Sequence, residues 1–257
     1  MDLQIAQQTF IVCGATSGFG HATAKALLKE GATVIGIARH TDKLKKLAEI
    51  HKQNFIPLTG DLTTQKTIDE VASEARKHDI DGILINSAGP PAKSFAETRI
   101  EDWDTAYQNL LRWKVDLTQK LIPHFTKKEY GRIVYIESAS VKQPIENLVL
   151  STSIRLAVVG MMKTLSQEIS GQNITVNTIA PGSHETPAIE RLIKKKSETD
   201  GISYDDARQK MINNIPAKKM GDPEKLGTLA AWLLSPLSEF VTGQVYALEG
   251  GNVKSTL

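Results

Sequence analysis

The chain has 257 residues, of which 40% are hydrophobic and 23% charged, and its formal net charge is +2 at pH 7. This length allows one sizeable buried core, and the balanced charge gives no lean toward nucleic acid or a membrane surface. A single cysteine, Cys13, excludes an internal disulfide framework.

Targeting signals are not evident. Residues 1–8 carry an acidic residue and no basic region before an apolar run, so no signal peptide is predicted. No stretch approaches the roughly 20 apolar residues that cross a bilayer. Together with the lone cysteine, this predicts a cytoplasmic protein with no membrane or nucleic-acid partner, and no metal site is predicted.

Short, almost continuously apolar runs alternate with longer amphipathic segments. The runs are Phe10–Cys13, Thr33–Ala38, Phe55–Leu58, Gly82–Ile85, Ile133–Ile136, Ile174–Ile179 and Val245–Leu248. Such runs are typical of parallel strands covered on both faces. The pattern predicts a single-domain α/β fold over residues 1–257, a Rossmann-type doubly wound parallel sheet of about seven strands with helices on both faces.

Helical spacing of apolar residues marks the segments between the runs. The predicted helices are Ala22–Lys29, Leu44–His51, Ile68–Arg76, Trp103–Pro123 and Leu156–Ile169, and another opens at Asp222. Residues 185–220 interrupt the rhythm with two short predicted helices, Pro187–Lys196 and Tyr204–Asn213. This insertion follows the sixth strand, so it is predicted either to cover a substrate as a lid or to be a solvated surface excursion.

A glycine-rich turn connects the first strand to the first helix. It reads Gly14-Ala15-Thr16-Ser17-Gly18-Phe19-Gly20. Glycines let a backbone approach a pyrophosphate closely, and a helix N-terminus offers unpaired N–H groups and a positive dipole. A tight structural turn needs glycines too, but the position between the first strand and helix favours a dinucleotide site.

Several further motifs, in order, make the chain resemble the short-chain dehydrogenase/reductase family over nearly its whole length. They are Gly60-Asp61-Leu62, Asn86-Ser87-Ala88-Gly89, Pro181-Gly182 with Thr186, Val241-Thr242-Gly243-Gln244 and Glu249-Gly250-Gly251. The resemblance implies a nicotinamide dinucleotide cofactor and an oxidoreductase. It implies that Asp61 contacts the adenine, although a helix N-cap is the other interpretation of that residue. Asn86 to Gly89 would line the adenosine ribose, and the segment from Pro181 to Thr186 would hold the nicotinamide carboxamide.

The predicted cofactor-binding residues are therefore Gly14, Ser17, Gly18, Phe19, Gly20, Arg39, Asp61, Leu62, Asn86, Ala88, Gly89, Pro181, Gly182 and Thr186.

Arg39 indicates which cofactor binds. NAD-binding folds usually place an acid at the end of the second strand, whereas this strand ends Ile37-Ala38-Arg39-His40. A guanidinium suits a 2′-phosphate, so NADP is predicted over NAD, although Arg39 could also be an ordinary exposed arginine.

The family's catalytic residues are largely replaced. The resemblance places Ser138 on the catalytic serine, but Ser151 stands where the family has its proton-donating tyrosine and Arg155 where it has lysine. Leu110 occupies the position of the relay asparagine, with Asn109 beside it. A serine is a far weaker acid than a phenol, and arginine holds its proton, so the ordinary proton path is not available.

Other residues could donate the proton in place of the tyrosine. His184 follows Pro181-Gly182 and is the best candidate, although a lone loop histidine is more often incidental. Lys142 is favoured as a surface lysine and Tyr135 as a core residue, because strand alternation turns it away from Ser138. The sequence does not fix where Tyr107 points.

Two functions follow from these residues. One is an NADP(H)-dependent, 3-oxoacyl-reductase-like oxidoreductase that acts on a carbonyl or hydroxyl of a small molecule or acyl thioester, with Ser138, Ser151 and Arg155 as catalytic residues. The other is a catalytically silent dinucleotide-binding or scaffold protein; a weaker idea has Arg155 recruit an anionic acyl-phosphopantetheine group. The resemblance also implies a homo-oligomer, a tetramer or dimer, for which the apolar helix Leu156 to Met162 would suit an interface.

Overall fold

The computed structural model describes residues 1–256, so Leu257, the last residue of the predicted domain, lies outside the described part. Its centre is one seven-stranded sheet in the order β3-β2-β1-β4-β5-β6-β7, in which every neighbouring pair is parallel. The strands are β1 (Thr9–Cys13), β2 (Thr33–Ala38), β3 (Phe55–Thr59), β4 (Gly82–Asn86), β5 (Gly131–Ile136), β6 (Ile174–Pro181) and β7 (Val245–Leu248). All seven predicted strands are therefore present, and the predicted fold class is confirmed.

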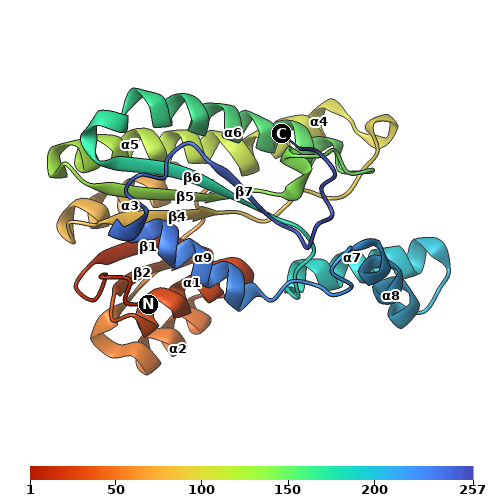
Figure 1. The fold of residues 1–257 in the computed structure, drawn as a ribbon, viewed down its shortest axis with the longest axis horizontal. Coiled ribbons are helices and arrows are strands. Elements are labelled where there is room, and N and C mark those ends of the chain that lie inside the picture. The colour runs from red at the N-terminus through yellow and green to blue at the C-terminus, as the bar shows by residue number, and fades with distance from the viewer. Residues whose placement is uncertain (257) are drawn as a thin grey trace.

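Helices cover both faces of this sheet (Figure 1). They are α1 (Gly18–Lys29), α2 (Thr41–His51), α3 (Gln65–Lys77), α4 (Ile100–Tyr107), α5 (Trp113–Lys128), α6 (Val149–Glu168), α7 (Pro187–Asp200), α8 (Tyr204–Asn214) and α9 (Pro223–Leu234). None of the helices in residues 1–256 is long and apolar enough to cross a membrane.

Alternating side chains of the strands feed two separate cores. Phe10 and Val12 of β1 face α1 and α9, whereas Ile11 and Cys13 of the same strand face the opposite core, which includes α3, α5 and α6. This follows from the two-residue period of a strand, and it explains why the runs read as continuously apolar.

The predicted helix from Trp103 to Pro123 is interrupted. A π-helical turn, η3 (Gln108–Arg112), lies between α4 and α5, and its Leu110 is buried. Such turns shift the register of a helix and are frequent at functional sites. The helix predicted over Leu156–Ile169 begins earlier in the structure, at Val149. The prediction missed this beginning because the Ser-Thr-Ser sequence there lacks the apolar spacing of a buried helix. Ser151 and Arg155 consequently lie one turn apart on α6.

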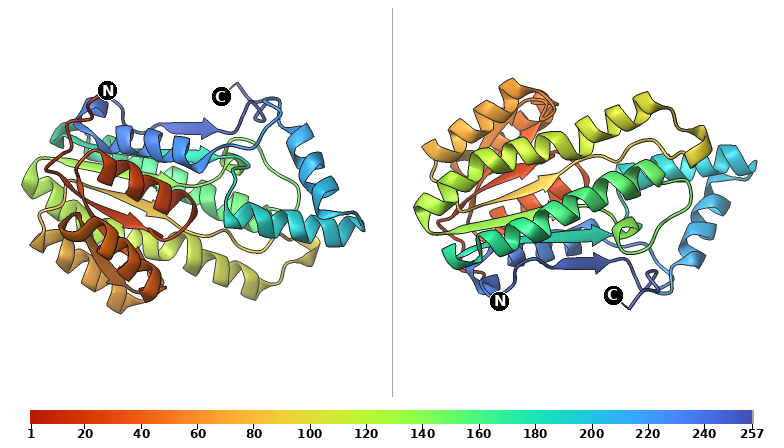
Figure 2. Two further views of the ribbon diagram at one scale, coloured as in Figure 1. Left: turned by 90° about the horizontal axis from the view of Figure 1, so that it is seen from below. Right: turned by 90° about the horizontal axis from the view of Figure 1, so that it is seen from above.

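Helices α7 and α8 pack largely on each other. Their buried residues, together with two that follow α8, form a small core of their own: Ile189, Ile193, Ala207, Ile212, Ile215 and Met220. Figure 2 shows the pair projecting beyond the carboxyl ends of the strands. In open α/β sheets, ligands bind at the carboxyl ends of the strands, at the point where the strand order reverses. Here that point lies between β1 and β4.

Candidate active site

The glycine turn has the backbone shape that its sequence predicts. Gly14 and Gly18 adopt left-handed φ angles of +73° and +54°. A Cβ on Gly20 would lie 2.3 Å from the carbonyl oxygen of Gly14, so no other residue fits there. Ser17 is the N-cap of α1 but makes no side-chain cap, which leaves the N–H groups of the first turn free for a ligand.

Polar groups from β4 lie beside this turn. Asn86 donates from Nδ2 to the carbonyl oxygen of Cys13 at 3.4 Å, and Ala88 and Gly89 are exposed. The Ser87 hydroxyl is buried and has no hydrogen-bond partner among the described residues. A glycine cradle, uncapped N–H groups and an unpaired buried hydroxyl together fit the phosphate and ribose of a dinucleotide.

Arg39 and Asp61 stand at the ends of the neighbouring strands β2 and β3. Arg39 is exposed, and its charge contributes to lowering the pKa of the Asp61 carboxyl. The main cause of that lowered pKa is a hydrogen bond from the Thr63 N–H to Asp61 Oδ1, at 3.0 Å. The N-cap of α3 is Thr64, so the interpretation of Asp61 as a helix cap is wrong. Leu62 packs against the sheet core.

The segment after β6 reaches back over the glycine turn. A Cβ on Gly18 would lie 3.7 Å from Cγ2 of Thr186, which is the N-cap of α7. Pro181 is the last residue of β6, and the Gly182 N–H donates to the carbonyl oxygen of Leu248 at 2.9 Å. The predicted cofactor residues from β1, β4 and β6 are thus brought together at one edge of the sheet.

His184 lies at the base of α7 and α8. Its ring is edge-on to Phe19 with centroids 5.2 Å apart, and a Cβ on Gly221 would lie 2.5 Å from Nε2. Nδ1 lies 3.1 Å from the Gly182 carbonyl oxygen, and burial lowers the pKa of the ring. A histidine ring packed in this way is suited to fixing the segment.

The three predicted catalytic residues come from β5 and α6. Ser138 follows β5 and is half-buried; its Oγ accepts from the Ser140 N–H at 3.2 Å. Ser151 and Arg155 are 6% and 4% exposed, and Arg155 Nε donates to Ser151 Oγ at 3.2 Å. The guanidinium therefore holds the serine hydroxyl oxygen from one side and leaves its proton free to donate elsewhere.

Sequence reasoning missed two charged residues behind this pair. Glu137 accepts from Arg155 Nη1 at 2.8 Å through Oε2, and from Lys114 Nζ at 2.5 Å through Oε1. Both the lysine and the glutamate side chains have no exposed surface. A signal was present, since Glu137 follows an apolar strand directly and Lys114 lies on the sheet-facing side of its helix.

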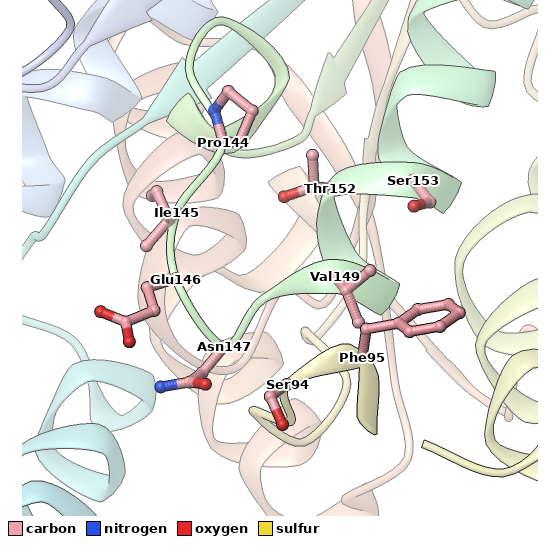
Figure 3. A pocket seen from close by; sticks show the side chains of 9 residues that line it. All are labelled: Ser94, Phe95, Pro144, Ile145, Glu146, Asn147, Val149, Thr152 and Ser153. Carbon is pink, nitrogen blue, oxygen red and sulfur yellow. The ribbon is translucent and has the colours of Figure 1, made fainter. Parts of the chain in front are cut away.

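An open cleft of about 340 Å³ lies at the start of α6. Figure 3 shows its lining side chains, which are Ser94, Phe95, Pro144, Ile145, Glu146, Asn147, Val149, Thr152 and Ser153. The Thr152 hydroxyl oxygen is buried without a partner among the described residues. The cleft borders the first turns of α6 through Val149, Thr152 and Ser153, whereas Ser138, Ser151 and Arg155 are not among its lining residues.

The doubly wound sheet and the glycine cradle at its switch point define a dinucleotide-binding protein of Rossmann type. The family model described as "Enoyl-(Acyl carrier protein) reductase" matches residues 14–252. The 3-oxoacyl-[acyl-carrier-protein] reductase FabG of Thermotoga maritima is 32% identical over 95% of this chain and 96% of that protein. The NADPH-dependent reductase BacG of Bacillus subtilis is 26% identical over 98% of this chain and all of its own length, 100%.

Solved structures agree with these relatives. L-sorbose reductase from Gluconobacter frateurii, complexed with NADPH and L-sorbose, superimposes with a TM-score of 0.92 at 26% identity, over 99% of this chain and 100% of that chain. The chain belongs to the short-chain dehydrogenase/reductase family. The family predicted from the motifs is therefore confirmed.

Proposed function

We propose that this member of the family is an NADP(H)-dependent reductase of a carbonyl group in a 3-oxoacyl-type substrate, with Ser151 and Arg155 in place of the family's tyrosine and lysine. The observation that carries the proposal is the buried hydrogen bond from Arg155 Nε to Ser151 Oγ, on the helix turn beside the cleft. The activities of the relatives support it, because they are reductions whose names include NADPH or a 3-oxoacyl substrate.

The chain's own residues fit NADP. Gly14, Gly18 and Gly20 form the phosphate cradle, and Arg39 at the end of β2 offers a guanidinium to the 2′-phosphate. Asn86, the last residue of β4, and Thr186, which follows β6, lie in the same region. When bound, the cofactor supplies the hydride for the carbonyl carbon.

Negative charge then develops on the substrate oxygen and must be stabilised and protonated. Ser138 and Ser151 donate hydrogen bonds to that oxygen, and Arg155 stabilises the charge through Ser151 Oγ. Since Arg155 keeps its proton, the proton that completes the alcohol passes from the Ser151 hydroxyl to the oxygen. Water returns a proton to Ser151, with release of hydroxide, when the lid opens and the alcohol leaves. One hydride and one proton thus convert the ketone to the alcohol.

Residues 185–220 act in this proposal as a substrate lid. Their ends meet at the bridge between His184 and Gly221, and Lys195 Nζ on α7 donates to the Ala92 carbonyl oxygen at 2.9 Å across the site. A lid excludes water from the reacting atoms and commits the substrate. Apolar lining from Phe95, Ile145 and Val149 suits the acyl part of the substrate.

In this proposal the protein is a cytoplasmic homo-oligomer. The outer face of α6 exposes Leu156 and Ala157, which supports a role for this helix in assembly. Light scattering on the purified protein gives the oligomeric state.

The test is NADPH oxidation by the purified protein with a 3-oxoacyl thioester. We expect Ser138→Ala and Ser151→Ala each to lower kcat by about 100-fold while the Kd for NADPH changes less than about twofold. Ser170→Ala, an exposed serine beyond the end of α6, is the matched control. NADPH binding without turnover by the unmodified protein would instead establish the silent dinucleotide-binding function.

A further inference from the structure

Three charged side chains form one buried unit under the candidate site. Lys114 comes from α5, Glu137 follows β5 and Arg155 comes from α6. The Glu137 carboxylate bridges the two cations, with Lys114 Nζ at 2.5 Å from Oε1 and Arg155 Nη1 at 2.8 Å from Oε2. Water is excluded, because Lys114 and Glu137 have no exposed side-chain surface and Arg155 has 5%. Charges in such surroundings interact strongly and are weakly screened by salt.

The unit carries a net charge of +1, from two cations and one carboxylate. Without Lys114, the pair of Glu137 and Arg155 would be neutral. Lys114 therefore gives the unit the net positive charge that the ion pair of Glu137 and Arg155 alone would lack. Burying an ammonium costs free energy, and a methionine of similar volume would fill the same space without that cost.

The unit points at the reacting region. Arg155 Nε donates to Ser151 Oγ, and Arg155 Nη2 lies 3.8 Å from where a Cβ on Gly89 would be. Arg155 Nη1 also donates to the Ile136 carbonyl oxygen at 3.4 Å, at the end of β5. The charge is thus held at the carboxyl edge of β4 and β5, beside the catalytic serines.

On the basis of the proposed function, we propose that Lys114 is a positioning residue of the active site. Through Glu137 it holds the Arg155 guanidinium against Ser151, and it supplies the net positive charge that stabilises negative charge on the substrate oxygen. The same charge opposes the positive nicotinamide of NADP⁺ and leaves the neutral ring of NADPH unaffected.

Lys114 is also the member of the unit that can change charge. Burial lowers its pKa to about 8, against the opposing pull of Glu137, and the charge of Arg155 lowers it further. The neighbouring Cys13 thiol and Tyr135 phenol keep their protons in this range. Burial raises the pKa of the Cys13 thiol on β1 to about 12, and burial also raises the pKa of Tyr135 on β5. The Trp113 ring lies 5.9 Å from Nζ and carries no charge.

The first experiment measures the Kd of NADPH and of NADP⁺ by calorimetry, without substrate. We expect the unmodified protein to prefer NADPH at pH 7, and Lys114→Met to reduce that preference by about fivefold. Lys114→Arg should retain it. In the unmodified protein the preference should decline between pH 7 and pH 9, whereas in Lys114→Arg it should stay constant. Lys120→Met, on the exposed side of the same helix, is the control and should change nothing.

The second experiment separates this inference from the proposed function. With a 3-oxoacyl thioester, Lys114→Met should lower kcat at least about tenfold with KM unchanged, and Lys114→Arg should recover most of it. If the unmodified protein turns over no substrate, the proposed function fails, and the binding preference still decides the role of Lys114. A preference that is the same in Lys114→Met and constant with pH overturns the inference. If Lys114→Met does not fold, the pH dependence of the unmodified protein and of Lys114→Arg decides it.

Discussion

Lys114 Nζ lies 2.5 Å from Glu137 Oε1, and neither side chain has any exposed surface. The same carboxylate binds the Arg155 guanidinium, so one buried anion is shared by two buried cations. Its removal would leave both cations unpaired in a region that water does not reach.

We therefore expect Glu137→Gln to be strongly destabilising. The amide keeps the size of the side chain but removes its charge, so the free energy of unfolding should fall by about 3–5 kcal/mol. Urea denaturation followed by circular dichroism measures it. Glu185→Gln is the control, since Glu185 pairs with Arg208 at 2.6 Å on an exposed surface and should change the free energy by less than about 1 kcal/mol. Equal, small effects of both substitutions would mean that the buried carboxylate is not needed to balance the cations.

The lowered pKa of Lys114 predicts a dependence of stability on pH. Between its folded pKa of about 8 and the ordinary lysine value of 10.5, the folded state releases this proton while the unfolded state keeps it. The free energy of unfolding of the unmodified protein, relative to Lys114→Met, should therefore rise over this window, by up to about 1.4 kcal/mol per pH unit. Denaturation of both proteins at several pH values checks this. A difference that falls as the pH rises would show that the lysine gains more from Glu137 than it loses by burial.

Gly20 should tolerate no side chain. A Cβ there would lie 2.3 Å from the Gly14 carbonyl oxygen and 2.7 Å from that of Cys13, so the backbone of the turn must move. We expect Gly20→Ala to lose at least about 2 kcal/mol of stability and to bind NADPH at least about tenfold more weakly. Gly160→Ala is the matched control, because nothing lies within 4 Å of its added Cβ and alanine favours the helix. Thermal unfolding and calorimetry distinguish the two.

Arg39 should govern the choice between the two dinucleotides. It is exposed at the end of β2, and its charge acts on Asp61 at the end of β3. Arg39→Ala should weaken NADPH binding by about tenfold or more and leave NADH binding within about twofold, because only the 2′-phosphate loses a partner. Arg191→Ala, an exposed arginine on α7, is the control. Parallel losses for both cofactors would assign Arg39 a role in the fold.

The sheet was predictable because its five inner strands are buried on both faces and every strand carries a nearly continuous apolar run. The first turn of α6 was not, since Ser151-Thr152-Ser153 lacks the apolar spacing of a buried helix. The π-helical turn at Gln108–Arg112 was also missed. Such a turn holds one extra residue but uses the same kinds of residue as an α-helix, so the sequence does not mark it.

In the candidate site, the motif residues were predictable because backbone geometry demands them, as at Gly14 and Gly20. The pairing of Lys114 with Glu137 was not, because the residues are 23 positions apart and meet only through packing of α5 on the sheet. Thr64 in place of Asp61 as the cap of α3 shows the same limit at short range, since both side chains suit an N-cap.

The base of α7 and α8 has a consequence for how such proteins diversify. The segment begins and ends at the bridge between His184 and Gly221, and its apolar residues bury one another. An exchange of everything between these two positions would disturb neither of the two cores beside the sheet. Recombination or gradual drift that keeps Thr186, which lies beside Gly18, can therefore give this scaffold a new cover, and with it a new substrate, while the glycine turn and the buried charged unit stay unchanged.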